Sequence, residues 1–158
     1  MAVTRHCILA RSGREAEPWQ VEGMGRMRRE EIVSYCLSKP GAVETWPFGD
    51  GMAVFKVAGK LFALCPVDAD PPEVSLKCDP MLATALRSTY RAVRPGYHLN
   101  KRHWNTVTLD GSVDDDEVEE WIDHSYELVV AKLPRTERVA LCPEGTPDPA
   151  RRPSEDGP

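Results

Sequence analysis

Two short apolar runs joined by a glycine-containing pair constrain this 158-residue chain more than any other feature. MAVFKV (52–57) and KLFALC (60–65) flank Ala58-Gly59. Apolar segments of strand length with so short a connection are typical of a β-hairpin. With a two-residue loop, Phe55 faces Phe62 across the strands, whereas a bulged loop shifts that pairing. We therefore expect an antiparallel sheet built around this hairpin.

Further apolar segments add strands to the hairpin. VSLKC alternates apolar and polar residues, as expected for a strand with one buried face. Runs rich in valine, threonine and aromatic residues, bounded by turn residues, indicate two more strands. The additional expected strands lie at 74–78, at 90–98 with a break at Pro95-Gly96, and at 105–109.

Helical spacing of apolar residues indicates helices before, between and after these strands. Asp79-Pro80 is typical of a helix start, since aspartate caps the first turn and proline fits the first helical position. Ser112 and Asp115 resemble a capping box before the last helix. The expected helices cover 28–38, the residues that follow Asp79-Pro80, and about 114–133. This order predicts an α+β fold, an antiparallel sheet of about five strands covered by helices on one face.

The two ends of the chain lack such patterns. Residues 1–26 show no apolar periodicity, and the C-terminal end reads PEGTPDPARRPSEDGP, a proline-rich composition typical of disordered chain. We expect a flexible leader over 1–26, one domain over 27–134 and a disordered proline-rich tail over 135–158.

The sequence also predicts where the protein resides. No stretch approaches the roughly 20 apolar residues of a membrane-spanning helix, and the first residues lack the apolar core of a signal peptide. The five cysteines are scattered and form no C-x-x-C pair, which favours reduced thiols. We expect a cytoplasmic protein without membrane contact, and a monomer.

Metal and catalytic motifs are absent from the sequence. His98 and His103 do not have a recognised zinc-ligand spacing, and the acidic run at 114–117 suits the start of a helix. There is no nucleophile elbow, glycine-rich phosphate loop or paired-carboxylate motif, and Ser125 reads as a packed hydroxyl within a helix. We therefore expect no metal, no cofactor and no catalytic residue, although an enzyme of unrecognised chemistry stays open.

One stretch is strongly basic in a chain whose net charge is −5. Cations gather between residues 87 and 105, and no acidic residue occurs from 80 to 109. Lysine and arginine neutralise phosphates, histidine and asparagine hydrogen-bond to phosphates or base edges, and tryptophan stacks. The alternative is structural: Trp104 belongs to the core and the cations only keep a loop soluble.

Several longer motifs resemble the MmcQ/YjbR family of small bacterial proteins. The resemblance covers about residues 27–134, including the unusual PGYHLNK-x-HWNTV, within which Tyr97–Lys101 and His103–Asn105 follow the family pattern. The matching motifs are PG at 40–41, WPFG at 46–49, FKVAGKLFAL at 55–64, SLKCDP at 75–80, RPGYHLNKRHWNTVTLD at 94–110 and HSYELVVAKL at 124–133. The resemblance implies a CyaY-like fold, with a twisted antiparallel sheet covered by helices. It also implies DNA binding, because the family carries that label for a double-wing arrangement similar to that of certain transcription factors, and it offers no catalytic residues.

These observations together predict a DNA-binding protein that contacts phosphates through residues 87–105. Binding to double-stranded DNA should be weak and salt-sensitive. The alternatives are a small anionic ligand or a protein partner bound by the same patch, or an uncharacterised enzyme. The expected contact residues are Arg91, Arg94, His98, Asn100, Lys101, Arg102, His103 and Trp104.

Overall fold

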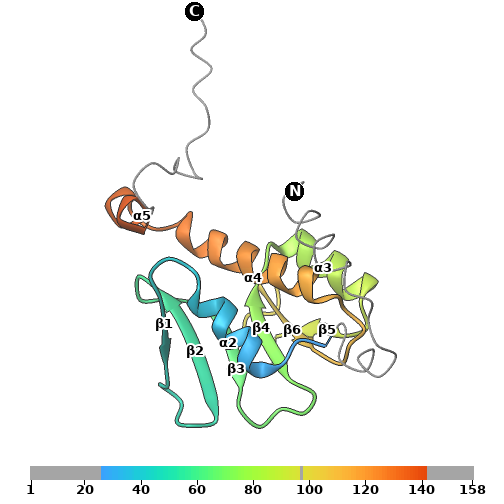
Figure 1. Cartoon of the computed structure of the whole chain (residues 1–158). Helices are drawn as coiled ribbons and strands as arrows, with labels where there is room; N and C mark the ends of the chain where they lie inside the picture. Colours follow the sequence, from blue (N-terminus) through green and yellow to red (C-terminus); the bar gives the residue numbers. More distant parts are fainter. Residues whose placement is uncertain (1–25, 97, 142–158) are drawn as a thin grey trace, which may run out of the picture.

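A six-stranded antiparallel sheet forms the centre of the computed structural model, which describes residues 26–96 and 98–141 (Figure 1). Its strands lie in the spatial order β1-β2-β3-β4-β6-β5. They are β1 (Ala42–Thr45), β2 (Met52–Val57), β3 (Lys60–Pro66), β4 (Glu73–Lys77), β5 (Val93–Pro95) and β6 (Trp104–Thr108). The α+β fold expected from the sequence is confirmed, with six strands instead of about five.

The additional strand is β1, at one edge of the sheet. Its four residues, AVET, are too few to show a strand period in the sequence. They become a strand because they pair with β2, from Ala42 opposite Val57 to Thr45 opposite Val54. An edge strand of this kind is set by its neighbour and not by its own composition.

The β2–β3 hairpin has both the two-residue turn and the bulge that were expected as alternatives. Ala58 and Gly59 both have positive φ, 48° and 75°, which a two-residue hairpin turn of the primed type requires. Val57 pairs with Lys60 across this turn, but a bulge then shifts the register so that Phe55 faces Ala63. The rings of Phe55 and Phe62 still meet, with their centroids 6.5 Å apart.

The helices are α2 (Arg29–Leu37), α3 (Pro80–Thr89), α4 (Asp115–Val130) and α5 (Arg135–Leu141). The carboxylate of Asp79 accepts hydrogen bonds from the backbone N–H groups of Met81 and Leu82, which confirms it as the cap of α3. The capping box expected before α4 is wrong. Ser112 instead donates to the carboxylate of Asp110, and α4 begins after Asp114. None of the described helices has the length and apolar content needed to cross a membrane.

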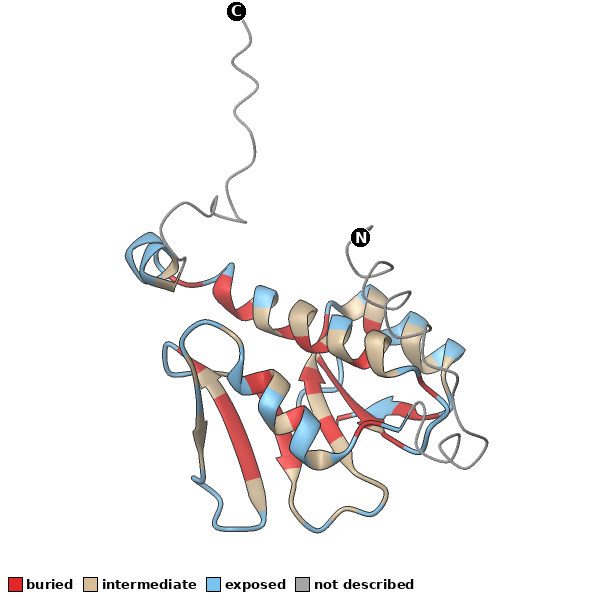
Figure 2. Ribbon diagram, viewed as in Figure 1, coloured by how far each residue is buried: buried red, intermediate tan, exposed pale blue. Residues whose placement is uncertain are grey.

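Helices cover one face of the sheet, and the main core lies between the two layers (Figure 2). Phe55 and Phe62 from the hairpin and Ile32 and Ile122 from α2 and α4 are fully buried there. Other members of this core are Cys36, Val57, Cys65, Val74, Val107, Val118 and Val129.

The opposite face has a smaller apolar cluster of its own. Val54, Leu64 and Trp104 are buried on it, with Met52, Leu61 and Leu99 packed against them. None of the residues of the described helices belongs to this cluster. Leu99 comes from the loop between β5 and β6, so this loop covers the face that the helices leave open.

Ser125 joins α4 to the sheet at a break in the β3–β4 ladder. These strands pair at Ala63–Leu76 and Leu64–Ser75 only, so Phe62 and Lys77 would be the next pair. The Ser125 hydroxyl stands between them: it donates to the carbonyl of Phe62 (2.5 Å) and accepts from the N–H of Lys77 (2.8 Å). The expectation of a packed hydroxyl is confirmed, with the sheet as its partner.

Helix α5 lies within the segment expected to be tail. Leu141 packs against the main core, next to Gly41, which has a positive φ of 69°. A Cβ at Gly41 would overlap the end of the Leu141 side chain, so a side chain there would force Leu141 to shift. The ordered part therefore extends past residue 134. The leader up to residue 25 and the tail from residue 142 lie outside the described residues.

The first prediction concerns Ser125. Replacing it with alanine leaves the Phe62 carbonyl and the Lys77 N–H without a partner in a fully buried site. Each unsatisfied buried group costs about 1–3 kcal/mol, so Ser125→Ala should lower the free energy of unfolding by about 2–4 kcal/mol in urea titrations. Ser34→Ala, at an exposed position of α2, is the control and should change it by under about 0.5 kcal/mol. A loss at Ser125 no larger than in this control would show that the bridge is not needed.

The second prediction separates α5 from the tail. A chain ending at residue 141 should melt like the full chain, whereas a chain ending at 134 should lose about 1–2 kcal/mol with the burial of Leu141. Thermal melts of both truncations, compared with the full chain, measure this. Equal melting temperatures for the two truncations would mean that α5 adds nothing to stability.

Candidate functional site

The basic stretch folds into a wing-like loop at one end of the sheet. Residues 96–103 connect β5 to β6, and the loop leads directly into Trp104, which pairs with Lys77. The ladder continues one step further, where the Cys78 N–H donates to the carbonyl of His103 (2.7 Å). The β3–β4 register brings the Ala58-Gly59 turn to this same end. Lys60 and the loop are thus two strand spacings apart, on the order of 10 Å.

Backbone contacts shape the described part of the loop, Gly96 and residues 98–103. The Gly96 N–H donates to the carbonyl of Trp104 (3.0 Å), and the His103 N–H donates to that of Asn100 (3.1 Å). Gly96 has to be small here, because a Cβ would lie 2.9 Å from the Cβ of Trp104 and 3.1 Å from that of Leu99. The glycine of the PGYHLNK motif is therefore explained by packing.

Three of the expected contact residues are not positioned to contact DNA beside the loop. Trp104 is only 8% exposed and belongs to the second-face cluster, so its ring braces the loop and cannot stack on a base. Arg94 pairs with the carboxylate of Glu73 (2.7 Å) and donates to Thr108 (2.8 Å). Arg91 is exposed, but its neighbour Ala92 accepts a hydrogen bond from the N–H of Thr108, at the end of β6 that is far from the loop. Arg91 therefore lies away from the loop.

The others remain in or beside the loop. Lys101 and Arg102 are exposed at its tip. The Asn100 side chain accepts from the Arg102 N–H (3.0 Å), so it shapes the turn. His98 is exposed with a positive φ of 57°, and His103 is half-buried. Tyr97 lies outside the described residues.

Arg87, at the border of the basic stretch, points inward to this loop. Its guanidinium donates to the side-chain oxygen of Asn105 (2.6 Å) and to the carbonyls of Trp104 (3.2 Å) and Lys101. It therefore links α3 to the loop.

Further lysines join the loop at this end of the sheet, and sequence reasoning missed them. Burial lowers the pKa of Lys77, and the nearby positive charge of Lys132 lowers it further. We call Lys60, Lys77, Lys101, Arg102 and Lys132 the basic end. Only the strand register and the path of α4 bring these residues together, so no local sequence pattern marks the group.

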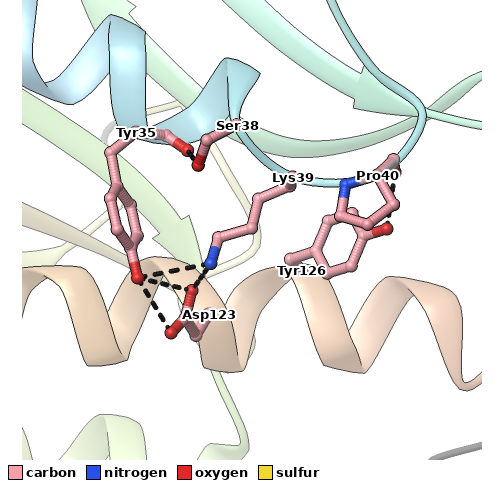
Figure 3. Close-up of polar contacts among 6 residues, drawn as sticks. All are labelled: Tyr35, Ser38, Lys39, Pro40, Asp123 and Tyr126. Carbon is pink, nitrogen blue, oxygen red and sulfur yellow. Dashed lines mark hydrogen bonds and ion pairs between the residues drawn. The ribbon is translucent and has the colours of Figure 1, made fainter. Parts of the chain in front are cut away.

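The ion pairs formed between described residues lie elsewhere. Their cations are Arg26, Arg28, Lys39 and Arg94. Lys39 shows the contrast, since it follows α2 near this end of the sheet but is neutralised by Asp123 of α4 (Figure 3). The Tyr35 hydroxyl donates to the same carboxylate (3.0 Å), and burial together with Asp123 raises the pKa of Tyr35. This cluster fastens α2 to α4. No comparable ion pair among residues 26–96 and 98–141 involves the basic end.

The described thiols are not suited to nucleophilic chemistry. Cys36, Cys65 and Cys78 are buried and unpaired. Burial raises the pKa of Cys36 to about 12 and those of Cys65 and Cys78 to about 11, so their thiolates are scarce at neutral pH. Within residues 26–96 and 98–141, no three histidine, cysteine or acidic side chains are grouped to hold a metal ion.

A hollow of about 700 Å³ lies at the opposite end of the sheet, around the start of α2. Its wall mixes arginines with carboxylates and includes Arg29 and Asp115. The Arg26–Asp70 ion pair lies on its wall. This balanced charge does not favour an anion, in contrast to the basic end.

Comparison with known proteins places the chain among bacterial proteins that it matches over nearly their whole length. The YjbR family model matches residues 37–128. The uncharacterized protein YjbR of Escherichia coli K12 is 41% identical over 115 residues, covering 73% of this chain and 98% of that protein. YbdF of E. coli O157:H7 is 34% identical over 114 residues, covering 72% of this chain and 93% of that protein.

Solved structures agree with the fold. The crystal structure of Deinococcus radiodurans protein DR2400 matches with a TM-score of 0.70 and 40% identity, covering 79% of this chain and 93% of that one. A Pseudomonas syringae crystal structure matches with a TM-score of 0.57 and 28% identity, covering 65% of this chain and 98% of that one.

Proposed function

The chain belongs to the YjbR family, and we propose that it is a cytoplasmic protein that binds the phosphate backbone of duplex DNA through its basic end. The observation that carries this proposal is the unpaired charge there: none of the ion pairs among residues 26–96 and 98–141 involves Lys60, Lys77, Lys101, Arg102 or Lys132. Lys77 and Lys132 repel each other, and an approaching phosphate relieves that repulsion.

Preorganisation of the wing-like loop supports the proposal. Its tip is held by Asn100 and Arg87, and Leu99 anchors it to the second face. A loop already fixed in the free protein loses little conformational entropy when it binds. The β2–β3 turn and the loop form two neighbouring projections at one end of the sheet, an arrangement compatible with the double wing implied by the family resemblance.

The same geometry argues against strong sequence readout. The Trp104 ring is buried, and the Asn100 side chain is already engaged in the turn, so the two side chains best suited to stack on or read bases are occupied. Exposed lysine and arginine side chains recognise phosphates without base information. We therefore expect weak, sequence-independent binding, in the roughly micromolar range of non-specific contacts.

The third prediction tests this function by salt titration. If three to five cations of the basic end contact phosphates, the log–log slope of affinity against salt on random duplex DNA should be about −2.7 to −4.5. Replacing Lys101 and Arg102 with alanine should flatten the slope by roughly two units and weaken every sequence alike. Fluorescence anisotropy at several salt concentrations measures both.

A matched control removes the same charge from the other end of the sheet. Arg26→Ala with Arg91→Ala should leave the slope within about half a unit of the wild-type value. An equal loss in both double variants would mean that net charge matters and location does not. No binding by the folded protein at about 50 mM salt would remove the DNA proposal, leaving a small anion or a protein partner for the basic end.

A further inference from the structure

Arg87 differs from the other cations of the basic stretch because its guanidinium bonds to the wing-like loop itself and to the strand that follows it. Its Nε donates to the Asn105 Oδ1 (2.6 Å), and its Nη2 donates to the carbonyls of Lys101 and Trp104. The latter two residues bracket the end of the wing-like loop. The planar fork of a guanidinium is suited to hold several acceptors at fixed angles.

Asn105 completes this arrangement from the sheet. It is only 2% exposed, and its Nδ2 donates to the carbonyl of Ala83 (3.3 Å). Arginine can only donate and a carbonyl can only accept, so an amide is the neutral side chain of this size that satisfies both. Asn105, the second residue of β6, is therefore needed for structure, and its amide is not available to read a base.

Helical geometry explains why α3 can reach the loop. Ala83 and Arg87 are one turn apart and lie on the same face of α3. Long side chains on a helix point back toward its N-terminus, which here is the end nearest the loop. The Arg87 side chain thus spans from the second half of α3 to the Lys101 carbonyl.

We propose that Arg87 and Asn105 are positioning residues for the binding loop: together they hold Lys101 and Arg102 in the geometry that meets phosphates, and neither touches the partner. This inference rests on the proposed DNA binding. Without the brace, the loop has to be ordered at the moment of binding, which reduces affinity. The number of phosphate contacts, and with it the salt slope, stays the same.

The test uses Arg87→Lys and Asn105→Leu in the full chain, with random duplex DNA as the probe. Lysine keeps the charge at 87 but cannot span the acceptors, and leucine at 105 removes the amide without changing any charge. Both variants should bind roughly tenfold more weakly with a wild-type salt slope. Hydrogen exchange at 100–104 should be faster in both free variants than in the wild type.

Two comparisons make the result specific. The double variant should bind no more weakly than either single one, because both remove the same brace. Arg91→Lys, an equal exchange at an exposed arginine away from the loop, should leave affinity and loop exchange unchanged. Because Arg87 is only half-buried, Arg87→Lys still decides the question if Asn105→Leu does not fold.

The outcomes separate this inference from the function on which it rests. Wild-type protein that binds no DNA overturns both. If the wild type binds and the Lys101→Ala, Arg102→Ala variant binds more weakly with a flatter slope, wild-type affinity in Arg87→Lys overturns only the positioning role. A salt slope flattened by about one unit in Arg87→Met would likewise overturn it, by identifying Arg87 as a direct phosphate contact.

Discussion

The hydroxyl of Ser125 is the contact on which the rest of the structure depends. The β3–β4 ladder is broken at Phe62 and Lys77, and this hydroxyl bridges the two strands where their direct pairing ends. A break in the middle of a buried sheet would otherwise leave two backbone groups unsatisfied. Because Ser125 lies on α4, the same atom also fixes the height of the longest helix over the sheet.

The end of β4 that Ser125 secures also supports the wing-like loop. One residue later the Cys78 N–H bonds to His103 of the loop, and the Asp79 carboxylate then starts α3. From α3, Arg87 donates a hydrogen bond back to the loop, and Leu99 of the loop packs on the second face of the sheet. A sheet with helices on one face needs cover on the other, and here the loop provides that cover. Its Leu99 thus packs inward, and its Lys101 and Arg102 remain exposed.

Local chemistry made part of this fold predictable from the sequence. The hairpin, the three longer helices and the Asp79 cap follow from apolar periodicity and turn residues, which act over a few neighbouring positions. Strand β1 and helix α5 do not, because β1 depends on pairing with β2 and α5 on the contact of Leu141 near Gly41. Both contacts join segments that are distant in the chain.

The candidate site was only partly predictable for the same reason. The sequence indicates a basic stretch, but it cannot show that Glu73 neutralises Arg94 or that Trp104 is buried. Nor does it bring Lys60 and Lys132 to the loop, since that requires the strand register and the path of α4. The run of basic residues identifies the region, but contacts between residues distant in the sequence determine which of its described cations form ion pairs.

Mapping the backbone amide signals of the labelled protein by NMR during addition of duplex DNA shows which end of the sheet binds the DNA. We expect chemical-shift changes at Lys60, at 98–103 and at Lys132, weakening as salt is raised, with α2 and residues 67–72 unchanged. Changes confined to α2 and residues 67–72, which surround the hollow at the other end of the sheet, would contradict this expectation.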